Sequence, residues 1–239
     1  MYSFLEDPID SACLPEMNPS FFEESDECFV DIYAFSDRSI KVCMQYAKDK
    51  LDSAIGIAYV RKSVAEKLLA AKKLLPEGYS FEILDAWRPY GVQLSLYNAY
   101  LAQIRKNMPP DITDAELQKK VCEFVSYPDK RKKISYVHSS GGAVDLTIVD
   151  ADGNRLDMGS AFDEFSPKSY TMWFENNASD LTVRNNRRLL YNALCSCGFT
   201  NYPAEWWHYD FGDAFWSFYT EKKAIYTSKF ELKELTFNE

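Results

Sequence analysis

Apolar and polar positions recur with two different periods along this chain, and these periods predict a mixture of helices and strands. Over residues 63–75 apolar side chains return near the helical repeat, and Pro76 with Gly78 then gives a stop signal. Residues 79–85 alternate as a half-buried strand does. Pro89 ends that segment, and the pattern predicts a helix over 90–106.

The same signals predict the remaining elements. Thr113 and Glu116 match a capping box at the start of a helix. Gly198 fits a left-handed cap at the end of another helix. The further expected elements are a strand over 28–33, helices over 113–127 and 181–197, a hairpin of 143–149 with 154–158, and a strand over 205–211. Helices that alternate with strands early, followed by a hairpin and a late strand, indicate an α+β fold with an antiparallel sheet.

The chain shows no internal repeat, low-complexity tract or Gly/Ser linker that would separate domains. We therefore expect one compact domain over residues 1–239, with residues 1–27 as an irregular amino-terminal arm. Apolar residues make up 46% and charged residues 26% of the 239 residues, which is ordinary for a globular protein with a sizeable core.

Net charge and the amino terminus bear on partners and location. The formal charge of −9 disfavours binding to nucleic acid or to an anionic membrane surface. No apolar run approaches the roughly 18 residues expected of a membrane-spanning helix. The first residues lack the basic start and apolar core of a secretory signal, so we expect a cytoplasmic protein. Nothing in the sequence implies an obligate protein partner.

Both histidines of the chain lie in short motifs that also contain a carboxylate. His138 is followed by Asp145, and Glu205 precedes His208. Two imidazoles and one carboxylate match the three protein ligands of a catalytic zinc site, which leaves the fourth position open. The remaining carboxylate, on Glu205, could act as a general base. The alternative is a pair of packed imidazoles with chance carboxylates nearby, but the use of every histidine in such motifs favours a metallohydrolase.

The spacing within each motif constrains the geometry of this site. Gly141 and the glycine after it interrupt the first motif, so a loop there could turn His138 back toward the following strand. Glu205 and His208 are three residues apart, and on a regular strand they would point to opposite faces. A bulge or a strand end between them is therefore required if both belong to one site.

Arg88 is a further candidate because it directly follows the expected strand 79–85. A guanidinium at that place could stabilise the oxyanion that forms during amide hydrolysis. The alternative is a surface or core-edge ion pair, which is a common role of arginine.

Four blocks of sequence resemble a known family, the VanX-type D-alanyl-D-alanine dipeptidases among the zinc D-Ala-D-Ala metallopeptidases. The blocks are Asp85-Ala-Trp-Arg-Pro89, His138-x-x-Gly141-x-Ala143-x-Asp145-Leu-Thr147, Met158-Gly-Ser-Ala-Phe-Asp163 and Gly198-Phe-Thr-Asn-x-Pro-x-Glu205-Trp-Trp-His-Tyr209. They occur in the order typical of the family and cover most of the chain. The resemblance implies a compact α+β fold in which a small antiparallel sheet, flanked by helices, carries the zinc site.

The resemblance also implies specific roles. His138, Asp145 and His208 would hold one Zn²⁺ per chain, with Glu205 as general base and Arg88 as transition-state stabiliser.

Two further residues are implied to bind substrate. Asp163 ends the third block and would hold the free amino group of the substrate. Tyr136 stands two residues before the first histidine, where the family usually has a substrate-holding serine. The segment that begins at Phe35 also departs from the Asn-Phe-x-Gly of the family.

These observations together predict a zinc dipeptidase that hydrolyses D-Ala-D-Ala, or a close D-containing dipeptide, in a small, closed pocket. A small dipeptide is then the expected binding partner. Two alternatives remain open: a cell-wall D,D-carboxypeptidase or endopeptidase of the same fold, and a non-catalytic zinc-binding module.

Overall fold

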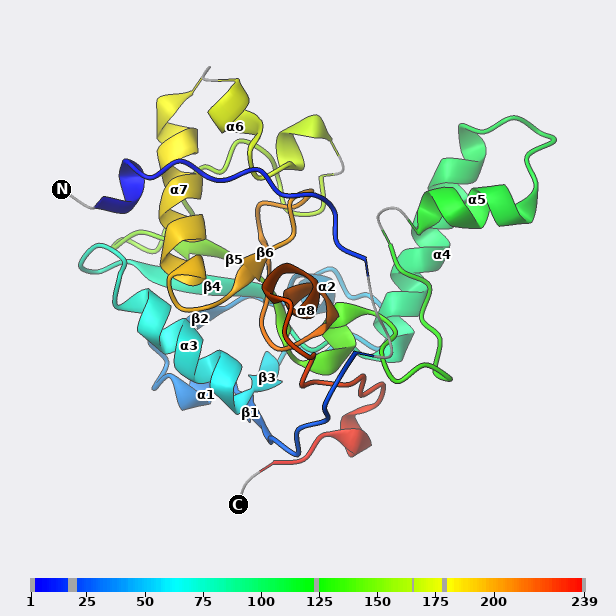
Figure 1. The fold of residues 1–239 in the computed structure, drawn as a ribbon, viewed down its shortest axis with the longest axis horizontal. Coiled ribbons are helices and arrows are strands. Elements are labelled where there is room, and N and C mark those ends of the chain that lie inside the picture. The colour runs from blue at the N-terminus through cyan, green and yellow to red at the C-terminus, as the bar shows by residue number, and fades with distance from the viewer. Residues whose placement is uncertain (1–2, 17–20, 123–124, 165, 178–179, 238–239) are drawn as a thin grey trace.

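A five-stranded sheet forms the centre of the computed structural model, which describes residues 3–16, 21–122, 125–164, 166–177 and 180–237 (Figure 1). In spatial order its strands are β2 (Lys41–Val42), β4 (Ser80–Asp85), β5 (Ala143–Val149), β7 (His208–Asp210) and β6 (Thr200–Asn201). The neighbours of β5 and β7 run antiparallel, as expected, whereas β2 runs parallel to β4. The sheet is therefore mixed, with an antiparallel centre that carries the candidate site.

Two helices, α3 (Lys62–Lys72) and α7 (Leu181–Cys195), contact each other beside this sheet and close the main core. The core contains fully buried side chains from α3, α7, β4 and β5, namely Leu68, Leu190, Ile83 and Leu146. On the other side of the molecule, α4 (Tyr90–Lys106) and α5 (Asp114–Val121) extend away from the body (Figure 1). Apolar residues on α4 and α5 form a small cluster of their own.

Shorter elements complete the fold. β1 (Phe29–Asp31) and β3 (Tyr59–Arg61) form a second, two-stranded antiparallel sheet. The remaining elements are α1 (Ile32–Phe35), α2 (Gln45–Lys48), α6 (Trp173–Asn176), α8 (Ala214–Thr220) and the 3-10 helices η1 (Ser3–Leu5), η2 (Val137–Ser140), η3 (Pro167–Ser169) and η4 (Leu232–Glu234). Apart from η1, the described part of the expected arm is irregular, and residues 1–2 and 17–20 lie outside the described residues.

The structure confirms most of the elements expected from the hydrophobic pattern. α4 and β5 have the expected bounds, and the expected segments 28–33, 63–75, 79–85 and 181–197 appear with ends shifted by up to three residues. Gly198 caps α7 with a φ of +90°, as its position at the helix end predicts. The capping box that joins Thr113 and Glu116 is also present.

Three expected boundaries were wrong. The helix that begins after Thr113 ends at Val121 instead of reaching residue 127, and residues 123–124 of that range lie outside the described residues. The expected hairpin is reduced to one bridge, between Val149 and Arg155. The late strand covers only His208–Asp210, since residues 202–207 form turns.

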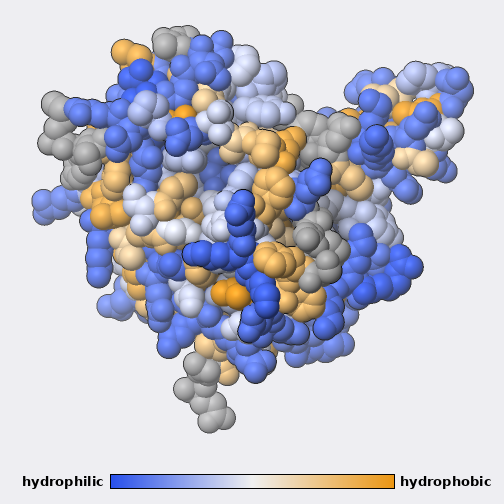
Figure 2. Space-filling model, viewed as in Figure 1, coloured by the Kyte–Doolittle hydropathy of each residue, from blue (hydrophilic) through white to orange (hydrophobic). Residues whose placement is uncertain are grey.

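The surface in view is largely hydrophilic, with apolar residues scattered among polar ones (Figure 2). Within the described ranges, no helix has both the length and the apolar character needed to cross a membrane.

Candidate metal centre and active site

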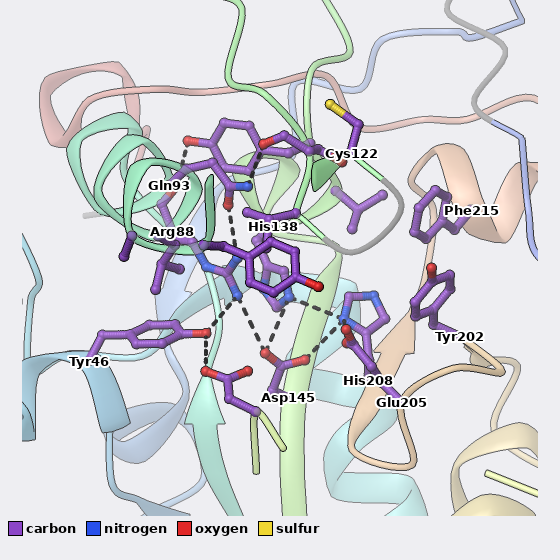
Figure 3. Close-up of a pocket in the computed structure, with 18 of the residues that line it drawn as sticks. Tyr46, Arg88, Gln93, Cys122, His138, Asp145, Tyr202, Glu205, His208 and Phe215 are labelled. Carbon is purple, nitrogen blue, oxygen red and sulfur yellow. Dashed lines mark hydrogen bonds and ion pairs between the residues drawn. The ribbon is translucent and has the colours of Figure 1, made fainter. Parts of the chain in front are cut away.

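Three side chains from distant parts of the chain converge at one end of the sheet (Figure 3). Nε2 of His138 lies 3.2 Å from Nδ1 of His208. Nδ1 of His208 lies 3.0 Å from Oδ1 of Asp145, and Nε2 of His138 lies 3.4 Å from Oδ2 of the same carboxylate. All three residues are at most 4% exposed. The structure thus brings together the three residues that the sequence predicted as ligands.

Strand register and a glycine turn produce this convergence. Asp145 on β5 lies directly opposite His208 on β7 in the antiparallel ladder. His138 belongs to η2, and Gly141, with a φ of +75°, caps its carboxyl end. A Cβ at Gly141 would lie 2.2 Å from the ring of Phe29, so the turn has no room for a side chain. The loop expected from the glycine pair therefore does return His138 to the start of β5.

The outer ring nitrogens of both histidines face acceptors. Nδ1 of His138 lies 2.8 Å from the carbonyl oxygen of Ala86, and Nε2 of His208 lies 2.8 Å from Oδ1 of Asp210. In the neutral rings, hydrogens on the outer nitrogens would pair with these acceptors, and the lone pairs of the inner nitrogens would then point at the common centre. Two lone pairs and the carboxylate of Asp145 repel one another at these distances unless a positive charge lies between them.

The donor set fits a zinc ion. Zinc ligands at bonds of about 2.0–2.1 Å and tetrahedral angles lie roughly 3.3 Å from one another. The two histidine nitrogens lie 3.2 Å apart, Oδ1 of Asp145 lies 3.0 Å from His208, and Oδ2 of the same carboxylate lies 3.4 Å from His138, so the donor atoms are close enough to share one ion. The local field also attracts positive charge: burial lowers the pKa of His208, but the carboxylates of Asp210 and Asp145 outweigh burial and raise that pKa well above its usual value.

Arg88 lies beside this cluster and is held in place by two side chains. Its Nε donates to Asp85 at 2.7 Å, and its Nη1 donates to Gln93 at 2.8 Å. Among the described residues, the contacts of Nη2 are two long ones of 3.5 Å, with Tyr46 and Asp145. This nitrogen can therefore donate a further hydrogen bond into the cavity, on a guanidinium that the other contacts hold rigid.

Glu205 lies outside the strand, which removes the conflict raised by its spacing from His208. The backbone N–H of Glu205 donates to Tyr202, and the N–H of His208 donates back to Glu205, so the chain turns between them. As a result Oε2 of Glu205 lies 3.8 Å from Nδ1 of His208. Burial, reinforced by Asp145, raises the pKa of Glu205 to about 8. The carboxylate therefore has a high affinity for a proton at the edge of the cluster.

Asp163 lines the same cavity but is not part of the ligand cluster. Tyr46 donates to its Oδ2 at 2.8 Å. Burial, with the nearby charge of Asp145, raises the pKa of Asp163 to about 7. A cation that came next to Asp163 would stabilise the ionised carboxylate, so this place suits an ammonium group.

Tyr136 forms part of the cavity wall and is 3% exposed. Its hydroxyl donates to the backbone carbonyl of Arg88 at 2.9 Å. Because this hydrogen is already used, the tyrosine oxygen can offer only an acceptor to a bound molecule.

These groups line a cavity of about 440 Å³. This cavity is larger than the small, closed pocket expected from the sequence, and it falls in the size range of sites for drug-sized ligands. The candidate ligands, Arg88 and Asp163 form its polar end. Side chains from α4 and from the segment after α5, among them Leu96 and Val125, line the remainder.

Sequence reasoning missed several groups that support the site. Asp210 could have been found, because it lies two residues after His208 on a strand and so faces the same side. Asp85 belongs to a recognised block, but its pairing with Arg88 was not expected. Tyr46 and Gln93 gave no signal, since their contacts join segments that only the fold brings together.

Comparisons with known proteins identify the family of this chain. Residues 48–228 match the family model described as D-ala-D-ala dipeptidase. Three curated relatives carry the name D-alanyl-D-alanine dipeptidase. The relative from Synechocystis is 29% identical over 175 residues, which cover 66% of this chain and 71% of that protein. The relative from Enterococcus faecium is 32% identical over 61% of this chain and 69% of that protein. The relative from Escherichia coli is 33% identical over 52% of this chain and 58% of that protein. The chain therefore belongs to the D-Ala-D-Ala dipeptidase family and is a metallopeptidase.

Proposed function

We propose that this protein is a zinc dipeptidase that hydrolyses D-Ala-D-Ala or a close D-containing dipeptide. One observation carries the proposal: the inner nitrogens of His138 and His208 and the carboxylate of Asp145 lie 3.0–3.4 Å from one another. Family membership and the acidic and basic groups around that centre support it.

His138, Asp145 and His208 would hold a single zinc ion in each chain. A zinc ion held by three protein ligands would supply Lewis acidity, which makes water more acidic and polarises a carbonyl group. Asp210 and the carbonyl of Ala86 fix the ring orientation of the two histidines through hydrogen bonds to the outer nitrogens.

Glu205 is the proposed general base. Its carboxylate would take one proton from the attacking water and pass it to the amine that leaves. In this hydrolysis the amide C–N bond breaks and the hydroxyl of water becomes part of the new carboxyl group. The distance of 3.8 Å between Oε2 of Glu205 and Nδ1 of His208 supports a role for this carboxylate beside the proposed centre.

The remaining groups would position the substrate. Nη2 of Arg88 would donate to the carbonyl oxygen as negative charge develops on it. Asp163, oriented by Tyr46, would hold the free amino group of the dipeptide. Tyr136 would accept a hydrogen bond from the substrate, a role that differs from the donor and acceptor roles open to a serine.

The test is release of D-alanine from D-Ala-D-Ala by purified protein, with L-Ala-L-Ala alongside. Treatment with a chelator should abolish release, and one equivalent of zinc should restore it. Release from the D,D dipeptide alone would establish the substrate and the metal together. Absence of release from every dipeptide by zinc-loaded protein would contradict the proposal. Cleavage of an acylated peptide that ends in D-Ala-D-Ala, with no action on the free dipeptide, would favour the carboxypeptidase alternative.

A further inference from the structure

The cavity continues well beyond the groups that the proposed reaction uses. Figure 3 shows Tyr46, the partner of Asp163, and Cys122 on opposite sides of His138, and both residues line the same cavity. Its volume of about 440 Å³ falls in the range that accommodates drug-sized ligands, whereas a dipeptide of two alanines is much smaller. A bound D-Ala-D-Ala would leave a large part of this space unfilled.

Away from its polar end the cavity is lined mainly by apolar side chains, with Gln103 and Ser126 as polar members. Leu96 and Tyr100 of α4 form one side, and Val125, in the segment after α5, forms another. Tyr100 and Val125 are 8% and 9% exposed and belong to the apolar cluster that joins α4 to that segment. Leu14 of the amino-terminal arm also lines this part. Among the described residues that line the cavity, Arg88 alone carries a permanent positive charge, and it lies at the polar end.

The direction of the substrate follows from the proposed function, on which this inference rests. If Asp163 holds the amino group, the first residue of the dipeptide occupies the polar end next to Tyr46. With the scissile carbonyl beside Arg88, the second residue extends away from the polar end into the part of the cavity that Leu96 and Val125 line. The side chain of the carboxyl-terminal residue then lies in the apolar part of the cavity.

We infer that the enzyme prefers dipeptides whose carboxyl-terminal residue has a bulky apolar side chain, of the size of leucine or phenylalanine. Such a side chain would remove apolar surface of its own, and of the cavity wall, from water, and this transfer favours binding. An alanine at the carboxyl-terminal position offers only a methyl group and leaves most of that wall exposed to water. In this proposal, the preference for a bulky carboxyl-terminal residue is set by four residues of the cavity wall: Leu96, Ala99, Tyr100 and Val125.

The first experiment compares kcat/KM for D-Ala-D-Ala, D-Ala-D-Leu, D-Ala-D-Phe and D-Leu-D-Ala on the zinc-loaded protein. We expect kcat/KM for at least one of the two dipeptides with a bulky second residue to exceed that for D-Ala-D-Ala by about tenfold or more. D-Leu-D-Ala carries the same leucine at the other position, and it should show no such gain because Asp163 and Tyr46 line that end.

A pair of substitutions on α4 tests whether the carboxyl-terminal side chain of the substrate binds in this part of the cavity. Ala99 and Ala102 are both exposed, but only Ala99 is among the residues that line the cavity. Ala99→Trp should fill part of the apolar space and lower the ratio of kcat/KM for D-Ala-D-Phe to that for D-Ala-D-Ala by about tenfold. Ala102→Trp, the matched control, should leave the ratio as in the unchanged protein. An unchanged ratio in Ala99→Trp would show that the bulky side chain does not bind next to Ala99 and would overturn the inference.

The outcomes separate this inference from the proposed function. Efficient cleavage of D-Ala-D-Ala, with lower kcat/KM for both bulky dipeptides, would overturn the inference and leave the proposed function standing. If the zinc-loaded protein hydrolysed none of the dipeptides, the proposed function itself would be contradicted. Cleavage of the first bond of the tripeptide D-Ala-D-Leu-D-Ala as fast as that of D-Ala-D-Leu would mean that the space takes a further residue, and this too would overturn the inference.

Discussion

Nε2 of His138 and Nδ1 of His208 lie 3.2 Å apart although the two residues are separated by 70 positions in the chain. Neither nitrogen needs the other as a hydrogen-bond partner, because each ring already faces an acceptor with its outer nitrogen. Asp145 completes the group from the neighbouring strand. The proposed function depends on this contact and on the groups around it.

Glu205→Gln should abolish most hydrolysis while the protein keeps its metal. The amide has the size of the carboxylate but cannot take a proton, so kcat should fall by roughly 10²–10⁴ or more. Turnover and the zinc content of the same sample are the measurements. Loss of zinc in this variant would make Glu205 a ligand and overturn its assignment as base. His208→Ala is the comparison, since it should lose both zinc and activity.

Asp210→Asn should weaken metal binding although Asp210 is not a proposed ligand. The charged acceptor that now orients His208 and raises the basicity of its ring becomes neutral. We expect the affinity for zinc to fall by about 10–100-fold, measured by competition with a chelator. Asp152→Asn removes a carboxylate from an exposed turn and should leave the affinity unchanged. Equal affinities in the two variants would argue against this role of Asp210.

Arg88→Lys should lower kcat by about 10²–10³ even though the positive charge remains. A lysine ammonium cannot hold Asp85 and Gln93 and also donate to the substrate with the geometry of a guanidinium. Steady-state kinetics, with zinc content as a control for the intact centre, would measure the effect. Activity close to that of the unchanged protein would reduce Arg88 to a structural ion pair.

Asp163→Asn should act on recognition of the substrate amino group. The loss of the carboxylate should raise KM for D-Ala-D-Ala by about tenfold or more, since a charged hydrogen bond is worth about 1.5–3 kcal/mol. N-acetyl-D-Ala-D-Ala has no ammonium group, so the unchanged protein should discriminate strongly against it. In the variant the ratio of kcat/KM for the free and acetylated dipeptides should fall. A ratio that stays the same would exclude Asp163 from this contact.

Gly141→Ala should destabilise the fold and not only the site. The new methyl group would require a left-handed backbone at an alanine and would overlap the ring of Phe29. We expect a loss of about 2 kcal/mol or more in the free energy of unfolding, measured with urea. Gly56→Ala is a matched control, because nothing lies within 4 Å of a Cβ there. Similar stabilities of the two variants would show that Phe29 can move aside.

Local patterns were enough for much of the fold. α4 and β5 have the bounds that the hydrophobic periodicity predicted. The signals for them are local: the helix and strand repeats, the proline before the helix and the turn after β5 each involve residues that are close in the chain. The two histidine motifs also identified the residues that converge at the centre. Local patterns were least accurate at element ends, as in the late strand that begins at His208.

The sequence by itself determined the residue types of the site, their order and most of the elements that carry them. Only the tertiary structure decided where Glu205 lies relative to its strand, that Tyr46 orients Asp163, and how far the cavity extends along α4. The physical reason is the range of the forces involved. Helix and strand preferences act between residues close in the chain, whereas a hydrogen bond from Tyr46 to Asp163, 117 residues away, exists only after the sheet and its helices have packed.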